Sequence, residues 1–181
     1  MIEFYSYEEL AQHLRLLSPA AAIGVEGFCG AGKTYLADRL GSMLPAVSLD
    51  TDNFVKIQDS TLYYPEIVDL ERLAEALEEA DSQGRRVVLA GICLRDIAQR
   101  LSRTLAPIIY VKEVARTGLW HGLFHLEDFE TDGGARTLVN EPYLSDLLYH
   151  SRSRPHENAD ILFVRDEAVG GDEGNNLVAE S

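Results

Sequence analysis

The chain has 181 residues, which suits one compact domain of ordinary size. Its hydrophobic content of 46% supports a substantial core and excludes a wholly disordered or fibrous protein. Sixteen basic residues against 30 acidic ones give a net charge of −14, which disfavours nucleic acids and anionic membranes as partners. Two cysteines are too few for a disulfide framework, and no apolar run reaches the roughly 18 residues of a membrane span. We therefore expect a cytoplasmic protein.

Short apolar runs alternate with amphipathic stretches along the chain, a pattern typical of parallel strands joined by helices. The pattern predicts an α/β fold in which helices flank a five-stranded parallel sheet. The predicted strands cover residues 20–26, 46–49, 86–91, 106–111 and 160–164, and the predicted helices cover 7–17, 33–44, 65–80, 94–105 and 141–151.

The predicted elements form a single domain over residues 1–167. Residues 113–150, between the fourth and fifth strands, show no strand pattern and include an acidic, glycine-containing segment over 127–134. The glycine-rich, acidic residues 168–181 have little to bury, so we expect a flexible tail.

A phosphate-binding motif follows the first predicted strand. The segment matches G-x-x-x-x-G-K-[ST] between a buried strand and a helix, the context that this motif requires. Its residues are Gly27, Phe28, Cys29, Gly30, Ala31, Gly32, Lys33 and Thr34. The glycines allow successive backbone N–H groups to point inward, and the helix start adds partial positive charge. The motif predicts a di- or triphosphate site in which Lys33 approaches the terminal phosphates and Thr34 ligates Mg²⁺. The alternative is a tight turn with no ligand.

Two carboxylates, Asp50 and Asp52, follow the second predicted strand. If the chain stays extended, both side chains point to one side, near the edge where parallel strands open toward a ligand. One could orient or deprotonate an acceptor hydroxyl while the other holds the metal. The alternative is an aspartate that caps the next helix.

The combined pattern IGVEGFCGAGKTYLADRLG, VSLDTDNFV, YYPEIVDLERL, RVVLAGI and PHENADILF resembles the uridine kinase and phosphoribulokinase-like group of P-loop kinases. The resemblance implies a three-layer P-loop NTPase fold with a helical lid over about 113–150, and the use of ATP and Mg²⁺. In that group an Asp-x-Phe segment supplies the catalytic acid/base, and Asp52-Asn53-Phe54 matches it here. Tyr64-Pro65 and Asp69 stand where the group has His-Pro and a downstream Asp.

The chain departs from the group at two places. Ala90-Gly91 replaces a Glu-Gly whose glutamate helps to hold magnesium, and Asp50 is our candidate replacement. The lid segment, normally rich in arginine, contains only Arg116 between residues 113 and 130. Arg152 and Arg154 lie close to the fifth strand, where they could reach an adenine or a phosphate, or could simply favour a helix end.

Several other residues are open to two interpretations. Arg95 and Asp96 could contact the substrate or form a surface ion pair. The ring of Tyr64, like that of Tyr63, could stack on an acceptor or cover the core, and Phe54 belongs to the same candidate acceptor pocket. His121 and His125 have a spacing that could bind zinc, but a lid helix packing its aromatic face is favoured because no third ligand is evident.

We predict a magnesium-dependent kinase that moves the γ-phosphoryl group of ATP to a hydroxyl of a nucleoside or sugar-like acceptor. In this interpretation Lys33, Asp52 and Arg116 are catalytic, and a homodimer is compatible with the sequence. The arginine-poor lid and Ala90 favour a second hypothesis, a nucleotide-binding regulatory protein with a degenerate catalytic site. A third hypothesis, a phosphotransferase acting on a nucleotide or an antibiotic hydroxyl, differs only in the acceptor pocket.

Overall fold

The computed structural model describes residues 1–17, 21–56, 62–131 and 140–166. A six-stranded sheet with the order β1-β6-β5-β2-β4-β3 runs through the centre, and all its neighbouring strands are parallel. The strands are β1 (Ile2–Phe4), β2 (Ala22–Glu26), β3 (Ala46–Asp50), β4 (Arg86–Ala90), β5 (Leu105–Val114) and β6 (Ile161–Asp166). The predicted α/β fold with a parallel sheet is confirmed, but the predicted number of five strands is wrong.

The additional strand is β1, at the edge of the sheet. It has three residues, and Ile2 pairs with Ile161 at the other end of the described chain. A strand this short shows no periodicity, and the exposed Ile2 and Glu3 give no apolar run. The pairing with β6 forms the strand, so the local sequence could not predict it.

Helices join the strands and cover both faces of the sheet. They are α1 (Tyr7–Leu16), α2 (Lys33–Met43), the 3₁₀ helix η1 (Thr51–Phe54), α3 (Tyr64–Ile67), α4 (Leu70–Ser82), α5 (Leu94–Arg100), α6 (His121–Thr131), α7 (Tyr143–Ser153) and α8 (Pro155–Asn158). The helix predicted over 65–80 is divided into α3 and α4, because Val68 bridges to Val55 and the Asp69 side chain caps α4. The helix predicted over 94–105 ends at Arg100, since β5 begins at Leu105.

Two apolar clusters hold the layers together. On one face, Leu10 and Leu14 of α1 and Leu36 and Leu40 of α2 pack on the sheet. On the other face, α4 and α5 pack on β4 through a cluster that contains Leu73, Leu77, Leu94, Ile97, Val87 and Leu89. Helices cover β2 and β4 on both faces, and the sequences of these strands are therefore nearly continuous apolar runs.

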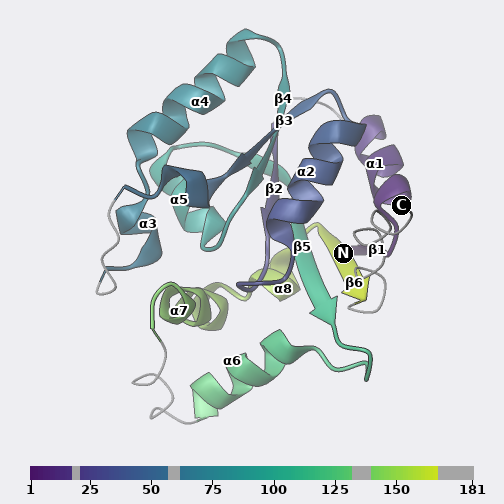
Figure 1. Cartoon of the computed structure of the whole chain (residues 1–181), viewed down its shortest axis with the longest axis vertical. Coiled ribbons are helices and arrows are strands. Elements are labelled where there is room, and N and C mark those ends of the chain that lie inside the picture. The colour runs from purple at the N-terminus through teal and green to yellow at the C-terminus, as the bar shows by residue number, and fades with distance from the viewer. Residues whose placement is uncertain (18–20, 57–61, 132–139, 167–181) are drawn as a thin grey trace, which may run out of the picture.

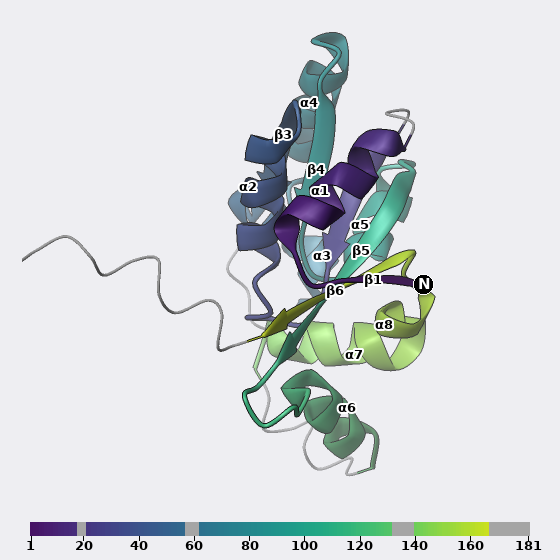
Figure 2. The same cartoon turned by 90° about the vertical axis from the view of Figure 1, so that its right-hand side faces the viewer.

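The helices α6 and α7 lie beyond the sheet, on the side where β2 and β5 end (Figures 1 and 2). The chain therefore places its phosphate-binding segment, which follows β2, next to α7. Within the described ranges, no helix combines the length and the apolar character needed to cross a membrane.

The core on the α2 face predicts a strong effect of Leu36→Ala, since Leu36 is 1% exposed. We expect the free energy of unfolding to fall by about 2–5 kcal/mol, because the substitution removes buried methyl groups and leaves a cavity. Urea denaturation measures the loss. The matched control is Leu16→Ala, whose side chain is 82% exposed and should change stability by less than about 0.5 kcal/mol. Equal losses in the two variants would contradict this assignment of the core.

Candidate functional site

The loop between β2 and α2 closes tightly at two glycines. Gly27 has a φ of 154°, and a Cβ there would lie 2.6 Å from the carbonyl oxygen of Val111. Gly32 has a φ of 88° and caps α2. The ammonium of Lys33 reaches back across the loop and donates to the carbonyl oxygen of Phe28 at 2.8 Å. The local sequence thus produces a tight loop between β2 and α2, and the phosphate site that the motif predicts stays a prediction.

The two predicted metal contacts lie side by side. The hydroxyl of Thr34, at the start of α2, donates to Oδ2 of Asp50, at the end of β3, over 2.5 Å. Thr34 and Asp50 offer the hard oxygen ligands that Mg²⁺ prefers, so these residues fit the ion. In the described part of the chain, no group of three or more His, Cys, Asp or Glu side chains could hold a metal by itself. The side chain of His121 lies outside the described residues.

Asp50 also caps the turn that follows β3. Its Oδ1 accepts from the backbone N–H of Asp52 at 3.0 Å and begins the 3₁₀ helix η1. The chain therefore turns between Asp50 and Asp52, and the extended backbone on which we based the prediction of their shared orientation is absent there. The capping interpretation and the contact with Thr34 both hold, because each uses a different oxygen of Asp50.

Asp52, the candidate acid/base, receives a hydrogen bond from a buried tyrosine. The hydroxyl of Tyr64 donates to Oδ1 of Asp52 and also lies 2.9 Å from Oγ1 of Thr51. Burial raises the pKa of Tyr64, so the phenol keeps its proton and acts as a donor. The ring is 3% exposed and offers no face to an acceptor, so only its hydroxyl reaches the site. Phe54 is 7% exposed and packs under the guanidinium of Arg72.

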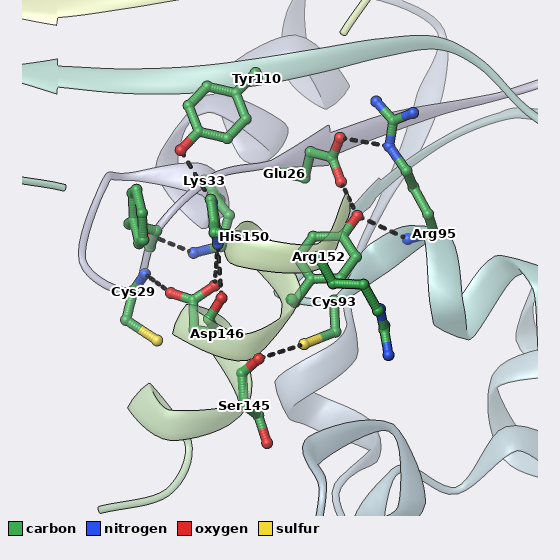
Figure 3. A network of polar contacts seen from close by, with 12 residues as sticks. Glu26, Cys29, Lys33, Cys93, Arg95, Tyr110, Ser145, Asp146, His150 and Arg152 are labelled. Carbon is green, nitrogen blue, oxygen red and sulfur yellow. Dashed lines mark hydrogen bonds and ion pairs between the residues drawn. The ribbon is translucent and has the colours of Figure 1, made fainter. Parts of the chain in front are cut away.

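One helix, α7, contacts both sides of this site, and Figure 3 shows its contact with the loop. The buried carboxylate of Asp146 accepts from the backbone N–H of Cys29 at 2.7 Å, and His150 stacks on Phe28 with ring centroids 3.7 Å apart. On the other side, Oγ of Ser145 accepts from the backbone N–H of Tyr64 at 2.8 Å. The position of the phosphate loop relative to the Asp52 segment therefore depends on α7.

Cys29 lies inside the loop as a thiol. Burial raises its pKa to about 12, and the carboxylate of Asp146 adds to that rise. The thiolate is thus disfavoured near neutral pH, in agreement with the prediction that Cys29 is a small filler and not a reactive group.

Arg95, predicted to contact the substrate, is engaged inside the fold. Its Nε donates to Glu26 at 2.9 Å, and its Nη2 donates to the carbonyl oxygen of Asn158 at 3.0 Å. Glu26 also accepts from the hydroxyl of Tyr149 at 2.6 Å (Figure 3). The side chain of Glu26 is only 1% exposed, and this burial raises its pKa although Arg95 opposes the rise.

The other predicted arginines are not gathered at the loop. Arg152 pairs with Asp96, which also accepts from the hydroxyl of Tyr63 at 2.7 Å. Arg154 pairs with Glu130 of α6 at 2.9 Å. Arg116 is exposed in the turn after β5 and has no ion pair among the residues that the structure describes.

A guanidinium that the sequence analysis missed lies against the loop. Arg165, near the end of β6, packs on Gly32 so closely that a Cβ there would lie 2.6 Å from its Nη1. It pairs with Glu113 of β5 at 3.2 Å. Arg165 directly follows the apolar residues of the last parallel strand, and the ends of parallel strands meet at the edge of the sheet where the loop lies. This position is the signal by which the sequence could have indicated Arg165. Asp146 gave no such signal, since one acid on an amphipathic helix is usually solvated.

No protein-family model matches the chain. Uridine-cytidine kinase D of Dictyostelium discoideum is 30% identical over 94 residues, which are 50% of this chain and 19% of that kinase. The chain thus spans about a fifth of the length of this relative.

The fold is similar to the structure of a possible uridine kinase from Bacillus stearothermophilus. The TM-score is 0.52 at 12% identity, and the match covers 87% of this chain and 96% of that one. The likeness shows the fold, and the two comparisons together make the chain similar to uridine kinase-like P-loop kinases.

The buried Glu26 predicts a pH-dependent stability. Its raised pKa means that the unfolded chain, with an ordinary value of 4.5, loses this proton first as the pH rises. The stability that Glu26 contributes is therefore present below pH 4.5 and is lost as the pH rises through its folded pKa, by about 1.4 kcal/mol for each unit of the rise. The variant Glu26→Gln has no ionisable side chain at this position, so it lacks this pH-dependent contribution.

We expect the free energy of unfolding of the natural protein, minus that of Glu26→Gln, to be smaller at pH 7 than at pH 4. Urea denaturation at both values measures it. A difference that grew with pH would mean that Arg95 outweighs burial at this position.

Proposed function

We propose that the protein is a magnesium-dependent kinase that transfers the γ-phosphoryl group of ATP to a hydroxyl of a nucleoside or a related sugar-like molecule. The observation that carries this proposal is the meeting of Thr34 with Asp50 at the phosphate loop, with Asp52 on the next turn. A phosphate cradle, a pair of oxygen ligands and a carboxylate with one oxygen left for the acceptor are the parts that such a transfer requires.

Each part has a separate task. The loop amides and Lys33 bind the polyphosphate of ATP, and Thr34 and Asp50 hold Mg²⁺. The bound ion would offset negative charge on the phosphates. Asp52 orients the acceptor hydroxyl and accepts its proton. The hydrogen bond from Tyr64 fixes one carboxylate oxygen of Asp52 and leaves the other for the acceptor.

The division of the chain proposed from the sequence remains compatible with this function. We propose one kinase-like domain over residues 1–167, with the lid over about 113–150. The helix α6 and the first turns of α7 fall within that lid range. The tail over 168–181 lies outside the described residues.

A nucleotide-binding regulatory protein is the second candidate. Ala90 is fully buried in the apolar cluster on the α2 face, so position 90 itself offers no carboxylate where the uridine kinase-like group carries a glutamate, and the metal contact falls to Asp50 alone on that side. Acceptor-stimulated release of ADP, measured over a panel of nucleosides and sugars, separates the candidates. Nucleotide binding without any stimulation would favour the regulatory protein.

Asp52→Asn tests the kinase directly. We expect turnover to fall at least about 100-fold, because an amide cannot accept the hydroxyl proton. The Kd of MgATP, measured by calorimetry, should change little, since the loop is intact. Asp81→Asn is the matched control, as Asp81 pairs with Arg103 on the surface. Loss of MgATP binding with unchanged turnover per bound nucleotide would contradict the role of Asp52.

Arg165→Gln and Arg116→Gln compare two candidate phosphate contacts. Because Arg165 lies on the loop and Arg116 is exposed beyond β5, we expect only Arg165→Gln to weaken MgATP binding, by about tenfold. Part of that loss reflects the unpaired carboxylate of Glu113, so adding Glu113→Gln should recover some affinity. Calorimetry measures all three variants. A larger loss from Arg116→Gln would restore Arg116 as the lid arginine.

A further inference from the structure

An exposed aromatic ring follows directly after the proposed magnesium ligand. Tyr35 comes after Thr34 in the first turn of α2, and it is 49% exposed. The transfer described above gives this side chain no task. A half-exposed aromatic ring beside a phosphate loop is suited to stack on a nucleobase, because every base offers a flat π-face.

The ring of Tyr35 contacts a second tyrosine that is anchored in the core. Tyr7, at the start of α1, lies edge-on to it, with ring centroids 5.8 Å apart and an angle of 71° between the ring planes. Tyr7 packs on the buried Phe163 of β6, with centroids 4.9 Å apart, and the guanidinium of Arg39 lies over its ring. Because Tyr7 restricts the ring of Tyr35 before a ligand arrives, binding costs less conformational entropy.

The two tyrosines lie beside the phosphate loop. Arg165 of β6 approaches the loop so closely that a Cβ on Gly32 would lie 2.6 Å from its Nη1. The same guanidinium acts on the hydroxyl of Tyr7: burial raises the pKa of Tyr7, and the charge of Arg165 opposes the rise. Gly32 and Tyr7 thus share Arg165 as a neighbour, which places the pair of rings on the β6 side of the loop.

The order of the strands gives the direction in which a bound nucleotide extends. The loop follows β2, which has β4 and β3 on one side and β5 and β6 on the other. Asp52 follows β3, so in the proposed transfer the γ-phosphate points to that side. The nucleoside must then extend the opposite way, toward β6, which lies two strand spacings or about 10 Å from β2. Tyr35 and Tyr7 lie in that direction.

A cavity of about 430 Å³ between α6 and α7 is the alternative place for the base, since it also borders the loop and contains the ring of Trp120. Its acidic side chains include Glu113 and Asp128, and none of the described residues that line it is a lysine or an arginine. A negative wall disfavours a ligand that carries a triphosphate. The surface at Tyr35, with Arg165 beside it, is therefore favoured.

We propose that Tyr35 is the base-binding residue of the nucleotide site, and that its ring stacks on the base of the bound nucleoside triphosphate. The inference rests on the proposed function, because the direction of the nucleotide follows from transfer to an acceptor at Asp52. Stacking on Tyr35 adds affinity that the phosphates alone do not provide. The nucleoside is thereby held on the β6 side, and the γ-phosphate is directed toward Asp52.

Calorimetry with two probes that share the phosphates tests the stacking: MgATP, and magnesium tripolyphosphate, which has no nucleoside. We expect Tyr35→Ala to raise the Kd of MgATP about tenfold, the loss of one stacked base, and to change the Kd of tripolyphosphate by less than about twofold. The variant Tyr35→Phe keeps the ring and removes only the hydroxyl, so it should bind MgATP as the natural protein does.

Tyr143→Ala is the matched control, because Tyr143 of α7 is 57% exposed and lines the alternative cavity. Both Kd values should persist in that variant. An unchanged Kd of MgATP in Tyr35→Ala, an equal loss of both probes, a loss in Tyr35→Phe as large as in Tyr35→Ala, or a larger loss in Tyr143→Ala would overturn the inference.

Acceptor-stimulated release of ADP by the natural protein reports separately on the kinase. Stimulated release together with an unchanged Kd of MgATP in Tyr35→Ala would leave the proposed function standing and this inference refuted. A selective loss of MgATP in Tyr35→Ala without any stimulated release would support the base contact and contradict the kinase. Binding of neither probe to the natural protein would overturn both.

Discussion

The hydrogen bond between the Cys29 amide and the Asp146 carboxylate ties α7 to the phosphate loop, and the arrangement of the site depends on it. Ser145 of the same helix accepts a hydrogen bond from Tyr64, which contacts Asp52. Tyr149 of this helix donates to Glu26, the last residue of β2. A movement of α7 would therefore change the distance between the phosphate cradle and the candidate base. These contacts come from a segment more than a hundred residues away from the loop in the sequence. They therefore depend on the tertiary fold, and the loop motif alone does not specify them.

The difference between features that lie within the motif and contacts that come from remote segments explains how much the sequence could predict. The loop, its lysine and the strand before it follow from local rules, since glycines, an apolar run and a helix start are adjacent in the chain. The meeting of Thr34 with Asp50 followed from topology, because the ends of parallel strands share one edge of the sheet. The strand β1, Arg165 and Asp146 act only through partners that are remote in the sequence. No pattern within a short window could identify them.

The orientation of individual side chains was the least predictable feature. Arg95 and Tyr64 have residue types that suit substrate binding, yet Arg95 is held by the buried Glu26 and Tyr64 contacts the buried Thr51. For Arg95 the reason is energetic: the carboxylate of Glu26, once buried, requires donors, and Arg95 and Tyr149 supply them. Composition and spacing do not reveal which polar groups become buried, so they cannot reveal which arginines remain available for a ligand.

If the chain binds ATP as proposed, its net charge of −14 opposes that binding, and the positive groups that could offset it lie in a small region. Lys33, Arg165 and the amides of the loop concentrate positive potential at the cradle, while Asp50, Asp52 and Asp146 stand around it. Carboxylates this close to phosphates would repel them unless cations come between. Mg²⁺ can fulfil this role at Asp50. Asp146 differs from Asp50 because it is buried: its Oδ2 accepts from the amide of Cys29, and its Oδ1 lies 3.1 Å from Nδ1 of His150. Its carboxylate therefore faces groups of the protein, and the residue that orders the loop is itself held by the fold.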